Sequence, residues 1–171
     1  RITQILDELG NVLVANGYDG AGRVIDQTNG KGFTTTFVYN TPNPGDTAIT
    51  DPKGNVTIHT HDASLRLLKV TDATGQVTSF AYDTSNNRTG ITNQAGNTTL
   101  FTYDAIGNAT SITDPLGNAV NFSYDGQNNL TTATNARGFT TASNYDATGN
   151  LKTIQNAITN TTGFDYDGFG E

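Results

Sequence analysis

A Tyr followed by Asp, or a close variant of that pair, recurs along the whole chain at a nearly constant spacing. Every step is 21 residues except one of 22, between Tyr39 and His61. A period this short predicts a series of similar supersecondary units, each packed against its neighbours. The pairs are Tyr18-Asp19, Tyr39-Asn40, His61-Asp62, Tyr82-Asp83, Tyr103-Asp104, Tyr124-Asp125, Tyr145-Asp146 and Tyr166-Asp167.

A second motif lies half a repeat out of phase with the first. Asp114-Pro115-Leu116-Gly117-Asn118 and its relatives at 51–55, 72–76 and 93–97 combine Asp or Asn with a later Gly. Asp and Asn cap their own backbone and Gly accepts positive φ, so each segment predicts a turn. At the Tyr-Asp pairs we expect positive φ at Gly107 and Gly149, and at Asn86 and Asn128 in the equivalent places. The long step contains two prolines between residues 41 and 46, which indicates a widened loop.

Between the turns the side chains alternate with a period of two, which predicts strands. Thr99, Phe101 and Tyr103 share one face, and the other strand of each repeat is shorter and aliphatic. We expect an all-β fold of tandem antiparallel hairpins, about eight hairpins and roughly 16 strands, in a curved or spiralling strip that is part of a shell or fibre. The aromatic residues should form ladders on one buried face; they are Tyr18, Tyr39, Tyr82, Tyr103, Tyr124, Tyr145, Tyr166, Phe37, Phe80, Phe101, Phe122 and Phe164.

Composition argues against several classes of function. The formal net charge is -7 and the pI is about 4.5, so nucleic acid is not an expected partner. The absence of Cys excludes disulfides and thiolate metal sites, and no apolar run approaches the roughly 18 residues of a membrane span. No catalytic constellation stands out, so we expect neither an enzyme nor a cofactor.

Two sets of residues are candidates for metal binding. The Asp of each Tyr-Asp pair could attract calcium, although capping of its own turn accounts for its position. His59 and His61, two apart on one predicted strand, could bind a metal, but they occupy the Phe and Tyr positions of their repeat and no third ligand is evident. Several Asn residues match the glycosylation sequon, yet the repeat itself places Asn and Thr there.

The segment from Tyr103 to Asn118 reads Tyr-Asp-x-x-Gly-Asn-x-x-x-Ile-Thr-Asp-Pro-x-Gly-Asn. This pattern resembles the Rhs family, also called YD repeats, which includes bacterial polymorphic toxins, toxin-carrying subunits of insecticidal complexes and animal teneurins. The resemblance covers essentially the whole chain and implies a long β-strip that spirals into a hollow shell, often around a toxic C-terminal domain. No segment resembles the self-cleaving core of the family, so no proteolytic role transfers to a residue of this chain.

We therefore expect residues 1–171 to be one array of about eight repeats, cut mid-repeat at both ends, in a larger secreted or cell-surface protein of bacteria. Its function would be structural, as part of a shell that encloses a toxin or other cargo. The alternative is an adhesive or filament-forming module that binds glycans or copies of itself. The expected partners are the rest of its own chain or identical copies at the strip edges, with an enclosed toxin domain or glycans as further candidates.

Overall fold

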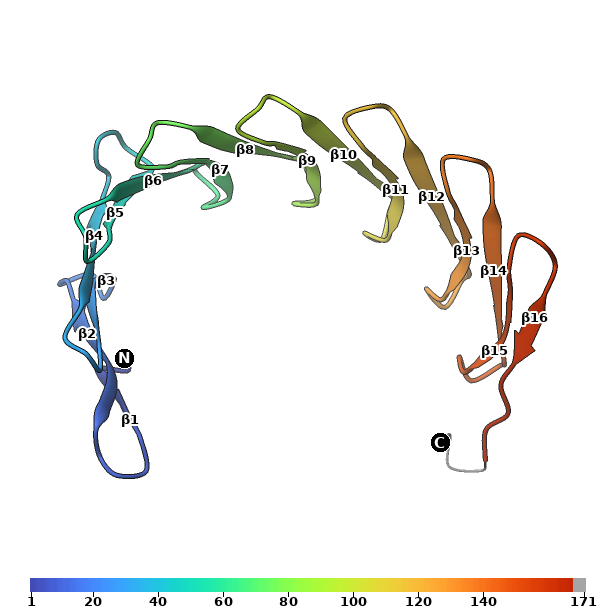
Figure 1. The fold of residues 1–171 in the computed structure, drawn as a ribbon, viewed down its shortest axis with the longest axis horizontal. Coiled ribbons are helices and arrows are strands. Elements are labelled where there is room, and N and C mark those ends of the chain that lie inside the picture. Colours follow the sequence, from blue (N-terminus) through green and yellow to red (C-terminus); the bar gives the residue numbers. More distant parts are fainter. Residues whose placement is uncertain (168–171) are drawn as a thin grey trace. The chain divides into compact units, whose positions relative to one another are not determined.

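The computed structural model describes residues 1–167 and divides the chain into two compact units, Arg1–Phe80 and Ala81–Glu171. All regular structure in the described residues is β-strand (Figure 1). The first unit holds β1 (Gln4–Leu6), β2 (Val12–Tyr18), β3 (Val24–Asn29), β4 (Thr34–Tyr39), β5 (Asp46–Thr50), β6 (Val56–His61) and β7 (Leu67–Thr71), and β8 (Val77–Tyr82) runs across the boundary. The second holds β9 (Arg88–Thr92), β10 (Thr98–Tyr103), β11 (Ala109–Thr113), β12 (Ala119–Tyr124), β13 (Leu130–Thr134), β14 (Thr140–Tyr145), β15 (Leu151–Gln155) and β16 (Thr161–Gly163).

In both units each strand pairs antiparallel with the next one along the chain, from β1 to β8 and from β9 to β16. This arrangement confirms the all-β class and the tandem hairpins. Strand order follows sequence order because each turn spans only a few residues and can join only adjacent antiparallel strands. Since no described segment forms a helix, none could cross a membrane as one.

Turns alternate between the two ends of the strands. The Tyr-Asp turns follow the Tyr-Asp pairs, and the half-repeat turns join each long strand to the short strand before it. The Tyr-Asp turns are 19–23, 62–66, 83–87, 104–108, 125–129 and 146–150, and the wide loop 40–46 replaces the one after Tyr39. The half-repeat turns are 7–11, 29–33, 51–55, 72–76, 93–97, 114–118, 135–139 and 156–160.

Both kinds of turn have the same backbone geometry. In 104–108 the Gly107 N–H donates to the Asp104 carbonyl at 3.2 Å, and the Asp104 N–H donates to the Asn108 carbonyl at 2.9 Å. The fourth residue of this turn must have positive φ, which Gly and Asn adopt most easily. Positive φ is confirmed at all four predicted places: Gly107 (94°), Gly149 (90°), Asn86 (68°) and Asn128 (68°).

Strand register differs between the two ends. Pairing across the half-repeat turns is regular from β3 onward, whereas most Tyr-Asp hairpins carry a bulge, as between Thr102 and Tyr103. The bulge places Tyr103 opposite Ala109. Because a bulge disrupts the ladder locally, it leaves backbone groups near the Tyr that need other partners.

The aromatic residues of the strands lie on one face, as expected, but that face is not buried. Phe101 pairs with Ile112, and Ile112 with Val120, so these side chains form one row of what we call the aromatic face. Within the described residues no hydrophobic side chain is buried, and the aromatic face is only half-buried, while Leu100 on the opposite face is 51% exposed. The expectation of a buried face was wrong because a single-layered sheet has no second layer to cover it.

Phe164 and Tyr166 depart from the expected columns. Both follow the end of β16 and are 37% and 39% exposed. The Phe164 N–H still donates to the Lys152 carbonyl at 2.9 Å, which prolongs the pairing by one bond. Beyond it, residues 168–171 lie outside the described residues.

Half-burial sets the expected cost of removing an aromatic ring. Phe101→Ala should lower the free energy of unfolding by about 2 kcal/mol, less than the 3–5 kcal/mol typical of a fully buried ring. Thr102→Ala, on the exposed opposite face, removes only a contact to the Thr110 hydroxyl and should cost less than about 1 kcal/mol. Urea denaturation of both variants measures the difference, and equal losses would contradict the assignment of faces.

Candidate functional surface

A tyrosine hydroxyl from the following repeat closes the gap at several of the bulges. The Tyr124 hydroxyl donates to the Ala109 carbonyl at 3.0 Å, and Ala109 is the residue opposite Tyr103 in the preceding bulge. The Tyr145 hydroxyl donates in the same way to Leu130, opposite Tyr124, at 2.9 Å. The same tyrosine clamp joins Tyr18 to Ile2, Tyr39 to Val24 and Tyr103 to Arg88. Each clamp therefore ties one repeat to the repeat before it.

His61 stands in the tyrosine column without a hydroxyl, and the wide loop before it explains why this is tolerated. In the regular repeat the β11–β12 ladder ends at Ser111 and Asn121, which leaves the Ala109 carbonyl to the clamp. The β5–β6 ladder instead continues to Asp46 and Thr60, and the His61 N–H donates to the Gly45 carbonyl at 2.9 Å. Backbone hydrogen bonds between β5 and β6 thus take the place of the tyrosine hydroxyl bond.

The Asp of the Tyr-Asp pair caps its own turn. Oδ1 of Asp104 accepts the N–H groups of Ile106 and Asn108, and its Oδ2 accepts the Asn108 amide at 3.0 Å. In the first unit Arg23 and Arg66 fill the place of this Asn and form ion pairs of 2.7 Å with Asp19 and Asp62. No group of three or more His, Asp or Glu side chains in residues 1–167 is placed to hold a metal ion.

These hydrogen bonds act on the charged form of the carboxylate. Bonds from the Thr148 hydroxyl first, and then from the Asn150 backbone, lower the pKa of Asp146 from 3.8 to about 2. The Asn55 side-chain amide similarly lowers the pKa of Asp51 in a half-repeat turn. Donors that stabilise a carboxylate favour its ionised state, so the turns are strongest when these Asp residues are charged.

Successive Tyr-Asp turns of the second unit also touch one another. The Asn108 amide donates to the Asn128 side-chain oxygen at 3.3 Å. A Cβ added at Gly149 would lie 3.9 Å from the Asn129 side-chain oxygen, so the next turn fits closely against that amide. Each of these contacts joins one repeat to the next.

His59 and His61 lie on β6 with their ring centroids 6.4 Å apart and their planes tilted by 57°. Burial lowers the pKa of His59, and the neighbouring His61 lowers it further. His59 therefore favours the neutral form. The two rings occupy the Phe and Tyr columns of the aromatic face.

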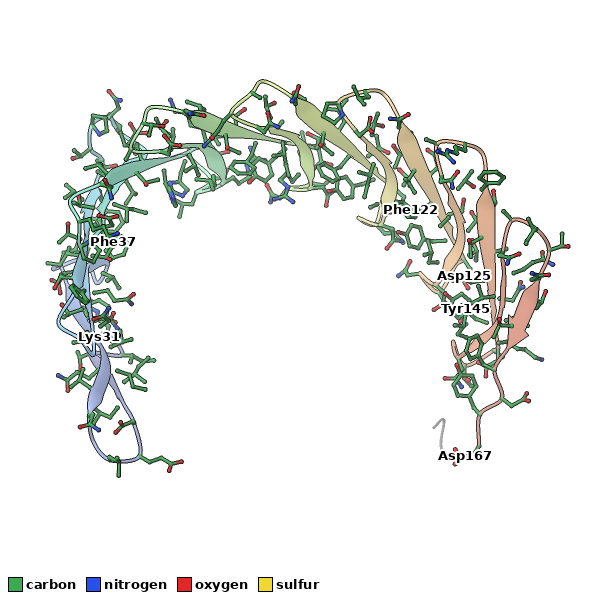
Figure 2. The ribbon with its side chains drawn as sticks, viewed as in Figure 1. Lys31, Phe37, Phe122, Asp125, Tyr145 and Asp167 are labelled. Carbon is green, nitrogen blue, oxygen red and sulfur yellow. The ribbon has the colours of Figure 1, made fainter. Side chains whose placement is uncertain are left out.

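The aromatic face carries most of the Phe and Tyr side chains of the strands. Phe122 and Tyr145 lie on the same side of the second unit (Figure 2), and their neighbours on this face are aliphatic residues, Thr or Ser. Arginines lie over some of the rings, with the Arg23 guanidinium 4.3 Å from the Tyr39 centroid and the Arg88 guanidinium 5.8 Å from that of Phe101. Such a face can hold another polypeptide by apolar and cation–π contacts.

Comparison with known proteins gave one family match and a set of structural neighbours. The family model described as the teneurin YD-shell matches residues 4–169. No curated protein matched the chain.

Two solved structures illustrate the similarity of fold. The complex TcdB2-TccC3-Cdc42 superposes with a TM-score of 0.69 at 18% identity, covering 91% of this chain and 10% of that one. The Photorhabdus luminescens Tc holotoxin pore with a mutated TccC3 gives a TM-score of 0.66 at 18% identity, covering 87% of this chain and 9% of that one. The chain thus spans about a tenth of the length of these relatives.

Removing one clamp hydroxyl should weaken the fold measurably. Tyr124→Phe leaves the ring in place and deprives the Ala109 carbonyl of its donor, so the free energy of unfolding should fall by about 1 kcal/mol. Tyr166 makes no such hydroxyl bond in the described structure, and Tyr166→Phe is the matched control that should change nothing. Urea unfolding tests both, and an unchanged midpoint for Tyr124→Phe would refute the clamp.

The lowered pKa of Asp146 predicts acid sensitivity. Because the folded-state value is below the unfolded value of 3.8, the carboxylate stabilises the fold above pH 3.8, and this contribution is lost as the pH falls toward about 2. Asp146→Asn keeps an oxygen acceptor that does not titrate, so its melting temperature should fall less over that range. The reciprocal control is Asn135→Asp, in a turn capped by Asn135 Oδ1, which should gain acid sensitivity. If the melting temperatures of all three proteins fall by the same amount as the pH decreases, the acid sensitivity does not come from these turn carboxylates.

Proposed function

We propose, from the premise that this chain belongs to the teneurin YD-shell family, that it forms part of the wall of a hollow β-shell that encloses another polypeptide. The family is a structural shell domain, so a scaffold role follows from membership. What the shell encloses is part of the proposal: a toxin or other cargo carried by the same, longer protein. The role is mechanical, without catalysis.

The half-exposed aromatic face is the observation that carries the enclosure. Each unit is one sheet thick, and its own side chains leave this face incompletely covered. In the second unit Phe122 and Tyr145 lie on the inner side of the curve that its hairpins follow (Figures 1 and 2). Apolar surface on the inner side of a wall suits contact with a second polypeptide held inside.

Several charged side chains of the first unit lie on the face opposite the aromatic face or in the turns. In the first unit Asp26 and Lys69 lie in rows of the opposite face, because they pair with Thr36 and Ser79. Lys31 and Lys53 lie in half-repeat turns, at the ends of the strands. These charged groups therefore remain in water on the outer side and at the rims, while Arg23 and Arg88 lie over rings of the aromatic face.

The named partners of the structural neighbours are consistent with this role. One neighbour is TcdB2-TccC3-Cdc42 and another is a Tc holotoxin pore, so chains with this fold occur in toxin assemblies. By extension we place this chain in a secreted or cell-surface protein of bacteria. The alternative role is an adhesive or filament-forming module that binds glycans or copies of itself. In that role the same strip would enclose nothing, and both of its faces would be exposed to solvent.

Site-specific photocrosslinking in the longest chain that carries this segment tests the enclosure. Ser143 lies in the phenylalanine column of the aromatic face, and Ser123 is exposed on the opposite face. A benzophenone amino acid at position 143 should form adducts with a distant segment of the same chain, whereas the same group at 123 should not. Equal yields from both positions, or adducts only between molecules from position 143, would reject enclosure and favour the filament.

A further inference from the structure

Both histidines of the chain lie on β6, in one repeat of the aromatic face. His59 takes the place that Phe101 holds in a regular repeat, and His61 takes the place of Tyr103. The exchange in the tyrosine column gives up a hydroxyl bond of the kind that Tyr103 makes to the Arg88 carbonyl. Two neighbouring positions that change together to the same metal-ligating residue, at a cost to the repeat, indicate a function of the pair.

The ring nitrogens of both histidines are available to bind an ion. Neither ring donates or accepts a hydrogen bond within the described part of the chain. No buried side-chain nitrogen or oxygen of residues 1–167 lacks a partner, so these unpartnered nitrogens reach solvent. Burial lowers the pKa of His59, which keeps that ring neutral at neutral pH, and the neutral imidazole is the form that binds metals.

The side chains beside the pair are not strong metal ligands. Thr47 and Val70 lie on either side of His59 in the antiparallel ladders. Leu67 lies opposite His61 on β7. None of these three neighbours carries a carboxylate, an imidazole or a thiolate, so the two histidine rings supply the donors at this place.

The carboxylates at this end of the strands are already engaged. Asp62 forms its ion pair with Arg66 at 2.7 Å. The Asp46 carboxylate accepts bonds from the Thr60 hydroxyl and the Asn43 amide. Zinc almost always takes four ligands, and residues 1–167 hold no group of three or more His, Asp or Glu side chains placed for an ion. An ion bound here must therefore be one that two nitrogens satisfy.

The separation of the two rings fits one ion between them. An ion bound to an imidazole nitrogen at about 2.0 Å lies about 3.2 Å from the centroid of that ring. Two rings that hold one ion in a straight line therefore have centroids about 6.4 Å apart, and those of His59 and His61 are 6.4 Å apart. Their tilt of 57° is compatible with this arrangement, because each ring can turn about that line without moving the ion.

We propose that His59 and His61 form a two-coordinate binding site for Cu(I). This monovalent ion has a filled d shell and is stable with two ligands in line, and imidazole is a ligand that copper favours. The site lies in the first unit alone, and it does not depend on what the shell encloses.

Anaerobic titration of the chain with Cu(I), in competition with a chromophoric chelator, tests the site. One ion should bind per chain. His59→Phe and His61→Tyr restore the residues of the regular repeat, and each should weaken binding by about a hundredfold or more, because a chelating pair becomes a single ligand. Melting curves check that both variants remain folded. An unchanged affinity in either folded variant would overturn the site.

A third variant keeps the number of histidines constant. Ile58 pairs with Ala48 and Thr71, so its side chain lies on the face opposite that of His59. His59→Phe combined with Ile58→His keeps two histidines on β6 but separates them across the sheet, and its affinity for Cu(I) should match that of His59→Phe alone. Binding as tight as that of the original chain would overturn the proposal, because the ion would then not require the two rings on one face.

Silver and zinc distinguish a two-coordinate site from general metal affinity. Ag(I) also favours two ligands in line and is not reduced or oxidised under these conditions. It should shift the side-chain nitrogen NMR signals of both histidines together and saturate at one equivalent. Zn(II) should bind about a hundredfold more weakly than Cu(I), since the further ligands it requires are lacking in the described residues. Failure of Ag(I) to shift both signals, or zinc binding as tight as that of Cu(I), would contradict the two-coordinate site.

Discussion

A sheet one layer thick cannot surround any of its side chains, and this constraint governs the rest of the structure. No hydrophobic side chain in the described residues is buried, so stability cannot come from a central core. It must come from contacts between one strand and the next, repeated along each unit. A typical 21-residue repeat supplies those contacts with two strands, two turns, one bulge and one tyrosine.

The tyrosine clamp compensates for the hydrogen bond that the bulge removes. A bulge strengthens the local twist of a hairpin but disrupts its ladder, and a carbonyl exposed there would depend on water. The hydroxyl of the following repeat reaches that carbonyl, as Tyr145 reaches Leu130. Where the ladder runs further, beside the wide loop, the column can change to His61 and the chain is free to differ.

The repeat, the alternation and the turn chemistry were predictable from sequence because they depend on local rules. The spacing of Tyr-Asp pairs led to hairpins and to about the observed number of strands, and Gly107 and Asn128 have the φ their turns demanded. Burial was not predictable, because an alternating strand looks the same whether or not a second layer covers it. The clamp was missed as well, although the column held Tyr rather than Phe in nearly every repeat, a preference that only a hydroxyl explains.

The half-repeat turns use Asn and Asp in the same role, and this has a bearing on chemical ageing. Asn29 and Asn135 accept the same two backbone N–H groups through Oδ1 as Asp51 and Asp114 do. Hydrolysis of such an amide to the acid would leave an acceptor oxygen in the same place and add one negative charge at the rim. Asn29 precedes Gly30, the kind of neighbour that leaves an Asn least protected from this reaction. The turn keeps its cap when the product is Asp, whereas the isoaspartate that an Asn-Gly pair also gives through a succinimide adds a backbone methylene and moves the acceptor oxygen away from the two N–H groups.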